Sequence, residues 1–370
     1  MTVIATIIIP VLNEEKRLPL LFKALDKVIP ASCEILFVNN ASTDNSKKLI
    51  GEFIAHSKLH VRLVDESVQG FPEPLRRGVS ETTADKILFL DADCLPTKNW
   101  AERMITGLDS ASIVVGETEN KIRKAPSDAE RLAADLFHGY SEFCALARGH
   151  ALPWGPACNL GVRRSCFENV GEFSSAAGSA FDIDWCWRAI LAGETLSYLP
   201  KAKVQHRRRV KKTAFLEQMH RYGLGEAWLR HAFQFLDEQE ARKPEHLAMD
   251  AFRRLSATKL SADNPLLAEA AAANAIGVIH GEMLPRKICK ETRAAPPKAI
   301  SWTSGKDEIT VYVPGRGVTT LAGPTLLVWH AWQSGATEKK IASMLAEAFE
   351  LAPEEAAHEA AHFVEAFEPA

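Results

Sequence analysis

The stretch Lys86-Ile-Leu-Phe-Leu-Asp91-Ala-Asp93-Cys-Leu-Pro96 runs from four apolar residues straight into two carboxylates one residue apart. A short apolar run of this kind is typical of a buried strand. In open α/β sheets, ligands bind beyond the carboxyl ends of the strands, where carboxylate oxygens can hold a hard divalent cation. An isolated Asp-x-Asp also occurs as a solvated turn, so the surrounding sequence has to decide between the two.

Strands alternate with helices through the first hundred residues. Apolar runs at 3–9, 34–38, 61–64 and 87–90 predict four strands, and the amphipathic spacing of 18–28 predicts a helix. Such alternation indicates an α/β fold, in which a mostly parallel sheet is covered by helices on both faces.

Polar side chains close three of these four strands. Asn13 and Glu14 follow the first strand, Asn39 and Asn40 follow the second, and the two aspartates of the opening stretch follow the fourth. Because parallel strands end at the same edge of a sheet, these side chains are expected to lie together. Three polar strand ends in a row favour a small-molecule site over unrelated turns.

A second block of reactive side chains lies in the middle of the chain. Asp182 and Asp184 stand in the first turn of an aromatic helix, where carboxylates also act as simple caps, so only one of the two needs a chemical role. A short strand at 202–205 ends in His206, and five cations follow within 207–212. This basic run is either a solvated face or a landing place for a phosphate or an acidic acceptor.

Bulk composition excludes several classes of protein. A formal net charge of -3 over 370 residues gives no general attraction to nucleic acid. The seven cysteines contain no Cys-x-x-Cys pair, form no readable zinc or disulfide framework and indicate reduced thiols in a cytoplasm. The chain opens without a charged leader, and its longest apolar tract, 266–284, carries polar residues, so we expect a soluble Ala-rich helix and no membrane span.

A chain of this length exceeds what one hydrophobic core usually organises. Changes in composition predict an α/β domain at 1–212, a helical extension at 213–284, a linker rich in proline and charge at 285–299, and a small α+β domain at 300–370.

The ordered motifs of the first part resemble glycosyltransferase family 2, over about residues 3–235. Each motif is short, and their order and spacing together make the signal specific. The motifs are Ile8-Ile-Pro10-Val-Leu-Asn13-Glu14, Val38-Asn39-Asn40-Ala-Ser-Thr-Asp44, Asp91-Ala-Asp93, Phe181-Asp182-Ile-Asp184-Trp-Cys-Trp-Arg188 and Val204-Gln-His206.

This resemblance implies a GT-A fold and a nucleotide-diphosphate sugar as donor, with a UDP-sugar favoured. Carried over by position, Pro10, Asn13 and Glu14 would border the nucleotide, and Asn39 or Asn40 would meet its base or ribose. Many family members have at least one Asp where this chain has the two asparagines, which leaves the nucleobase open.

The resemblance also implies a divalent cation, Mn²⁺ or Mg²⁺. Asp91 and Asp93 would hold the ribose and the metal, and His206 would complete the metal shell. In the family, a carboxylate at the position of Asp182 acts as general base, which implies an inverting enzyme. The residue before it is Phe where relatives usually have Glu, so Asp184 remains the alternative base.

The segment 300–370 predicts a small winged-helix-like domain of three short strands followed by three helices. Its order of elements resembles the PqqD-like domains called RiPP recognition elements, which bind leader regions of ribosomally made precursor peptides. The strands are expected at 300–302, 309–313 and 318–321, and the helices at 324–333, 337–349 and 353–367.

The resemblance implies that a peptide adds a strand beside the third strand of this domain, near Val318, Thr320 and Phe363. Four Lys and Arg against ten Asp and Glu in this segment argue against DNA binding. A plain packing or dimerisation role is the alternative.

Together these features predict a cytoplasmic, inverting, metal-dependent glycosyltransferase that modifies a Ser, Thr or Cys of a precursor peptide. One alternative is a glycosyltransferase that acts on a polysaccharide, a lipid or a small metabolite and uses the tail to dock a protein. The other is a scaffold that binds a sugar nucleotide or a peptide without catalysis.

Overall fold

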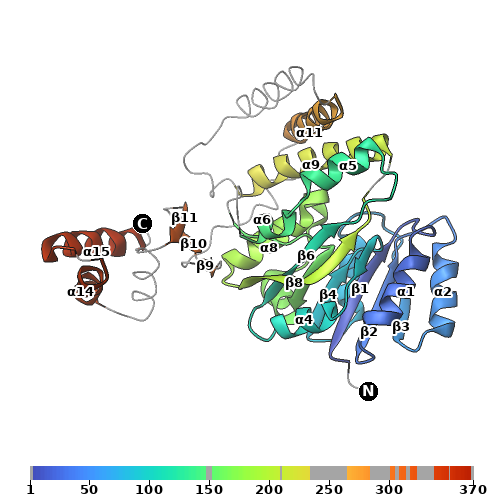
Figure 1. Cartoon of the computed structure of the whole chain (residues 1–370), viewed down its shortest axis with the longest axis horizontal. Helices are drawn as coiled ribbons and strands as arrows, with labels where there is room; N and C mark the ends of the chain where they lie inside the picture. Colours follow the sequence, from blue (N-terminus) through green and yellow to red (C-terminus); the bar gives the residue numbers. More distant parts are fainter. Residues whose placement is uncertain are drawn as a thin grey trace.

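The computed structural model of the chain describes residues 3–146, 152–208, 211–233, 265–283, 301–304, 308–313, 317–322, 337–349 and 351–367. Within these residues, the strands form one eight-stranded sheet and one three-stranded sheet. Helices pack on both faces of the larger sheet (Figure 1).

The first half of the large sheet is parallel, as the sequence predicts. Strands β3, β2, β1 and β4 are neighbours in this order and run the same way. Their carboxyl ends meet at one edge, which confirms the shared edge expected for the polar strand ends. These strands are β1 Ala5–Val11, β2 Cys33–Asn39, β3 His60–Asp65 and β4 Lys86–Leu90.

The second half makes the sheet mixed, where a mostly parallel sheet was expected. β7 is antiparallel to both of its neighbours, β4 and β6, and the outer strand β5 is antiparallel to β8. β8 is one long strand, although only its end was expected to be extended. These strands are β5 Cys94–Pro96, β6 Ile113–Asn120, β7 Asn159–Arg163 and β8 Leu196–His206.

Alternate residues of the central strands supply two separate cores, because successive side chains of a strand point to opposite faces. Ile7 and Ile9 of β1 pack with α1 and α2, whereas Ile8 packs on the other face with α3 and α8. The helices are α1 Leu18–Val28, α2 Ser46–His56, α3 Glu73–Glu81, α4 Trp100–Gly107, α5 Asp128–Leu136, α6 Tyr140–Ala145, α7 Arg164–Val170 and α8 Phe181–Leu191.

Two long helices, α9 (Lys212–Ala232) and α11 (Pro265–Met283), follow the sheet. They touch at two glycines: a Cβ on Gly223 would lie 2.0 Å from the Asn274 carbonyl oxygen, and one on Gly277 would lie 2.0 Å from that of His220. Gly223 therefore marks a close packing contact with α11, and α9 continues through it as one helix. No helix in the described part of the chain is both long and apolar enough to cross a bilayer.

The tail forms a three-stranded antiparallel sheet of β9 (Ser301–Ser304), β10 (Glu308–Val313) and β11 (Gly317–Ala322), with β10 in the middle. Helices α14 (Glu338–Phe349) and α15 (Pro353–Phe367) pack against each other. The three strands and the last two helices of the prediction are confirmed. The helix expected at 324–333 and the linker at 285–299 lie outside the described residues.

Candidate active site

The aspartates of the opening stretch lie next to the histidine that ends β8. Asp91 and Asp93 occupy the turn between β4 and β5, and β5 pairs with β8 so that Cys94 is opposite His206. This pairing places His206 Nε2 3.2 Å from Asp93 Oδ1, with side chains that are 15% and 16% exposed. Two carboxylates and one imidazole at this edge are a suitable ligand set for Mn²⁺ or Mg²⁺.

Arg207 fixes the backbone of the Asp-x-Asp turn. Its guanidinium donates hydrogen bonds to the carbonyl oxygens of Ala92 at 2.8 Å, Asp93 at 3.2 Å and Arg17 at 3.0 Å, and its backbone N–H also donates to Asp93 O at 3.0 Å. The guanidinium of Arg207 is therefore engaged with backbone carbonyl oxygens and is not part of a purely solvated face. The residue supports the turn that presents the two carboxylates.

Asn13 ties the loop after β1 to the loop after β2. Its backbone is left-handed, with φ of 57°, and its Oδ1 accepts hydrogen bonds from the backbone N–H groups of Thr43 at 2.8 Å and Asp44 at 3.3 Å. The Glu14 carboxylate pairs with Arg17 at 2.8 Å. Pro10, at the end of β1, is half-buried beside these loops. All three residues assigned to the nucleotide border therefore lie at the predicted edge.

Asn39 and Asn40 are buried at the same edge and are already hydrogen-bonded to the neighbouring chain. Asn39 donates to Asp65 Oδ1 at 2.9 Å, and Asn40 donates to the Val68 carbonyl oxygen at 2.6 Å. The hydrogen bonds from Asn39 and Lys47 lower the pKa of Asp65. Asp65, a carboxylate at the end of β3 that accepts this hydrogen bond from Asn39, was not predicted from the sequence.

A cavity of about 660 Å³ opens beside Asn13 and Glu14 and reaches the residues after β8. Its volume lies in the range of small-molecule sites. Cations outnumber acids in its lining, which suits an anionic ligand. The cations are Lys16, Arg17, Lys121, Arg123, Arg207 and Arg208.

The two carboxylates at the start of α8 have different surroundings. Asp182 is partly exposed, and its carboxylate accepts hydrogen bonds from the backbone N–H groups of Ala157 at 3.2 Å and Ile183 at 3.0 Å. Burial nevertheless raises the pKa of Asp182 to about 6. Asp184 is 2% exposed, and its Oδ2 accepts two hydrogen bonds from Arg188, at 3.0 and 2.9 Å. Asp182 is therefore the more accessible of the two carboxylates.

One short segment connects Asp182 with the Asp-x-Asp turn. Ala157 donates its backbone N–H to Asp182, and the next residue, Cys158, has its sulfur within 4.8 Å of a ligand atom of His206. His206 in turn contacts Asp93. Ala157 and Cys158, in the loop before β7, thus link the start of α8 to the Asp-x-Asp turn.

Asp184→Ala is expected to lower the free energy of unfolding by about 3 kcal/mol, because it leaves the Arg188 guanidinium without its partner in a largely buried place. Arg188 keeps its hydrogen bonds to the Val170 and Glu172 carbonyls, which holds the loss at the low end of the usual range. Urea denaturation measures the change. Asp182→Asn is the matched control on the same helix, and an equal loss in that variant would contradict the structural role of Asp184.

The peptide-binding residues of the prediction lie in the tail. Val318 and Thr320 belong to β11, which pairs with β10 alone and is an outer strand of its sheet among the described residues, and Phe363 belongs to α15. β9 contacts α8 and β8 of the large domain (Figure 1).

Comparison with known proteins matches residues 6–171 to the family described as Glycosyl transferase family 2. The chain is 29% identical over 198 residues to a Glycosyltransferase AglE from Haloferax volcanii, covering 52% of this chain and 63% of the relative. It is 28% identical over 228 residues to a Pre-mycofactocin glycosyltransferase from Mycobacterium tuberculosis, covering 59% of this chain and 46% of the relative. The chain thus spans less than two thirds of either relative.

Among solved structures, the chain is similar to the mannosyltransferase PcManGT from Pyrobaculum calidifontis in complex with GDP-Man and Mn²⁺. The TM-score is 0.48 at 16% sequence identity, and the match covers 80% of this chain and 78% of the other.

Proposed function

We propose that the chain is an inverting, metal-dependent glycosyltransferase with a nucleotide-diphosphate sugar, preferably a UDP-sugar, as donor, which the match of residues 6–171 to Glycosyl transferase family 2 supports. The observation that carries the proposal is the contact of Asp93 Oδ1 with His206 Nε2 at 3.2 Å. Asp91 lies on the same edge of the sheet, and Asp182 is linked to it through its hydrogen bond from Ala157. This edge combines ligands for a cation with a carboxylate of raised pKa.

Asp91, Asp93 and His206 would hold the cation, which when bound stabilises the negative charge that develops on the departing diphosphate. Arg207 keeps the turn in shape by donating hydrogen bonds to the backbone carbonyl oxygens of Ala92 and Asp93. Asn13, Glu14 and the cationic cavity beside them would position the nucleotide. Asn39 and Asn40, held by Asp65 and the loop after β3, would shape the pocket for the base or ribose.

Asp182 would accept the proton of the acceptor group as that group attacks the anomeric carbon from the face opposite the diphosphate. A pKa of about 6 suits this role, since the carboxylate is ionised at neutral pH and is more basic than an ordinary Asp. The backbone N–H groups of Ala157 and Ile183 orient its oxygens.

For the acceptor we propose a Ser, Thr or Cys of a ribosomally made peptide whose leader binds the tail. The outer position of β11 supports this, because an extended peptide can add to an open strand edge through backbone hydrogen bonds. The resemblance to PqqD-like domains assigns Val318 and Thr320 of β11, and Phe363 of α15, to this peptide contact. The contact of β9 with α8 supports a tail placed near the helix whose first turn holds Asp182.

A nucleotide sugar together with Mn²⁺ is expected to raise the melting temperature of the full chain by about 5 °C when the donor is present at a hundredfold excess over its Kd. A differential scanning fluorimetry screen of UDP-, GDP- and TDP-sugars measures this shift and ranks the nucleobases. Each donor is also tested with chelator, which should abolish the shift. No shift with any nucleotide sugar would contradict the proposed donor class.

Deleting residues 300–370 is expected to lower kcat/KM for a leader-bearing peptide by about 10²-fold, because the tether no longer concentrates the acceptor at the active site. Hydrolysis of the donor in the absence of peptide should be unchanged, which serves as the internal control for folding. Free leader peptide added to the full chain should inhibit transfer competitively. Equal peptide kinetics with and without the tail would refute peptide recognition by this domain.

A further inference from the structure

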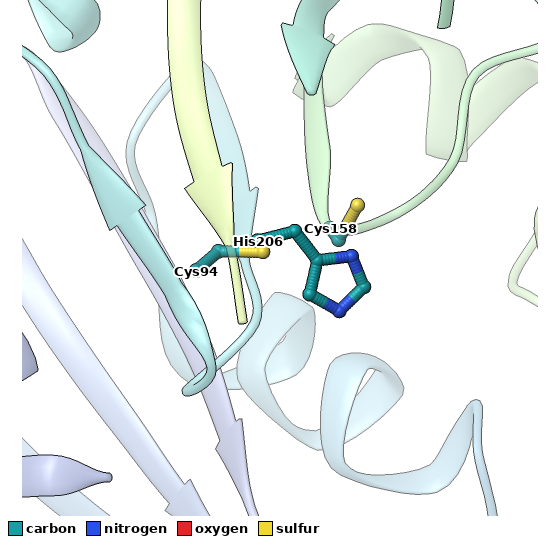
Figure 2. Close-up of side chains that lie close together, drawn as sticks. All are labelled: Cys94, Cys158 and His206. Carbon is teal, nitrogen blue, oxygen red and sulfur yellow. The ribbon is translucent and has the colours of Figure 1, made fainter. Parts of the chain in front are cut away.

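Two cysteines beside His206, behind the Asp-x-Asp turn, have no part in the proposed reaction. Cys94 begins β5, Cys158 precedes β7 and His206 ends β8. Their ligand atoms, two sulfurs and one imidazole nitrogen, all lie within 4.8 Å of one another. Figure 2 shows the imidazole ring of His206 beside both sulfurs. The two cysteines are buried, at 0% and 9% exposure.

The two nitrogens of His206 face different surroundings. Nε2 lies 3.2 Å from the Asp93 carboxylate. Nδ1 is buried and has no hydrogen-bond partner among the described residues, and Figure 2 shows it on the side of the ring toward Cys158. A buried ring nitrogen without a partner costs free energy unless something binds it. A cation held between this nitrogen and the two sulfurs would satisfy it.

We propose that Cys94, Cys158 and His206 Nδ1 form a binding site for a thiophilic divalent cation, Zn²⁺, separate from the oxygen ligands of the site for Mn²⁺ or Mg²⁺. Two thiolates and one imidazole are a common zinc ligand set that leaves a fourth position for water. Two thiolates also neutralise the charge of the ion, so the buried site carries no net charge. Binding exchanges the two thiol protons for the metal.

The geometry requires only small side-chain movements. Tetrahedral zinc with the usual bond lengths places its sulfur and nitrogen ligands about 3.6–3.8 Å apart. The present separations of up to 4.8 Å therefore have to shorten by about 1 Å at most. The Asp93 carboxylate on Nε2 supplies the carboxylate–histidine–metal arrangement that orients an imidazole ligand and fixes its tautomer.

Zinc at this site would compete with manganese, a consequence that rests on the proposed function. An imidazole that binds zinc through Nδ1 carries its proton on Nε2, and this N–H donates a hydrogen bond to the Asp93 carboxylate. That nitrogen is then no longer a ligand for the cation at the Asp-x-Asp turn. His206 would be shared, and zinc would inhibit transfer by removing a manganese ligand.

The direct test is a titration of the reduced full chain with Co²⁺, which replaces zinc and gives a near-ultraviolet thiolate-to-cobalt absorption. We expect this band in the wild type, its disappearance when one equivalent of Zn²⁺ is added, and a band about half as strong or absent in Cys94→Ser and Cys158→Ser. Cys166→Ser is the matched control, because Cys166 is equally buried on α7, away from the three ligands. Its spectrum should equal that of the wild type.

Absence of the band in the wild type would overturn the proposal, and so would a full band in Cys158→Ser. The wild-type result stands even if a cysteine variant does not fold. Asp182→Asn should keep the full spectrum whether or not it transfers sugar, so failure of the proposed function is recognised separately. In a second measurement, electron paramagnetic resonance of bound Mn²⁺, zinc should release manganese from the wild type and not from Cys158→Ser; retention in both would refute the shared histidine.

Discussion

Replacing Asp182 with Asn is expected to lower kcat for sugar transfer by about 10²- to 10⁴-fold, the range usually lost with a general base. Asn keeps the shape of the side chain and one of the two oxygens that accept from Ala157 and Ile183, but it cannot take a proton from the acceptor. The donor should still bind with its wild-type affinity, because the proposed role of Asp182 is toward the acceptor and not the donor. Initial rates with a leader-bearing peptide and a donor titration measure the two quantities.

The pH dependence provides the control for this variant. Burial raises the pKa of Asp182 to about 6, and only the ionised carboxylate can act as a base. Wild-type transfer should therefore fall as the pH drops below about 6 and be level above it, while the residual activity of Asp182→Asn should lack this inflection. Retention of most of the wild-type kcat, or an unchanged inflection in the variant, would remove Asp182 from the mechanism.

Replacing Asp93 with Asn is expected to lower kcat/KM by about 10²- to 10³-fold and to weaken Mn²⁺ binding, because the electrostatic stabilisation of the departing diphosphate depends on the ion. The turn itself should persist, since Arg207 donates hydrogen bonds to the backbone carbonyls of Ala92 and Asp93, which Asn retains. Activity assays over a range of Mn²⁺ concentrations, with manganese binding followed by electron paramagnetic resonance, test both expectations.

Asp109→Asn is the matched control for Asp93→Asn, because the carboxylate of Asp109 is exposed and pairs with Lys86 on the surface. It should leave both activity and Mn²⁺ binding unchanged. Chelation of the wild type should reproduce the loss seen in Asp93→Asn, and added Mn²⁺ should restore activity in the wild type alone. Full turnover in chelator would show that the Asp-x-Asp turn has another role.

Sequence reading succeeded where short-range patterns specify structure. β1, β2 and β4 are uninterrupted apolar runs, so their positions were predicted to within a few residues. β6 and β7 were not predicted, because glycine and charged residues interrupt their apolar runs. Gly116 of β6 leaves room for the Asn159 amide, and β7 contains Gly161 and ends in Arg163. A glycine that a strand needs for close packing looks, in a single sequence, like the end of that strand.

The sequence contained part of the information needed to decide which carboxylate of α8 is the proposed base. Residues two apart on a helix point to different faces, so Asp182 and Asp184 were unlikely partners from the start. Arg188, four residues after Asp184, is the usual helical spacing for an ion pair and could have marked Asp184 as structural. Only the packed structure shows that Asp184 is 2% exposed and that Asp182 remains accessible.

The sequence by itself determined which strands end in polar side chains and that parallel neighbours bring those ends to one edge. The tertiary structure alone decided that β5 and β8 pair, which sets Cys94 opposite His206 across more than a hundred residues of chain. It likewise placed Cys158 beside them, where the sequence showed no zinc framework. The physical reason is that local periodicity encodes how each segment folds, whereas the pairing of distant strands depends on how the whole sheet packs.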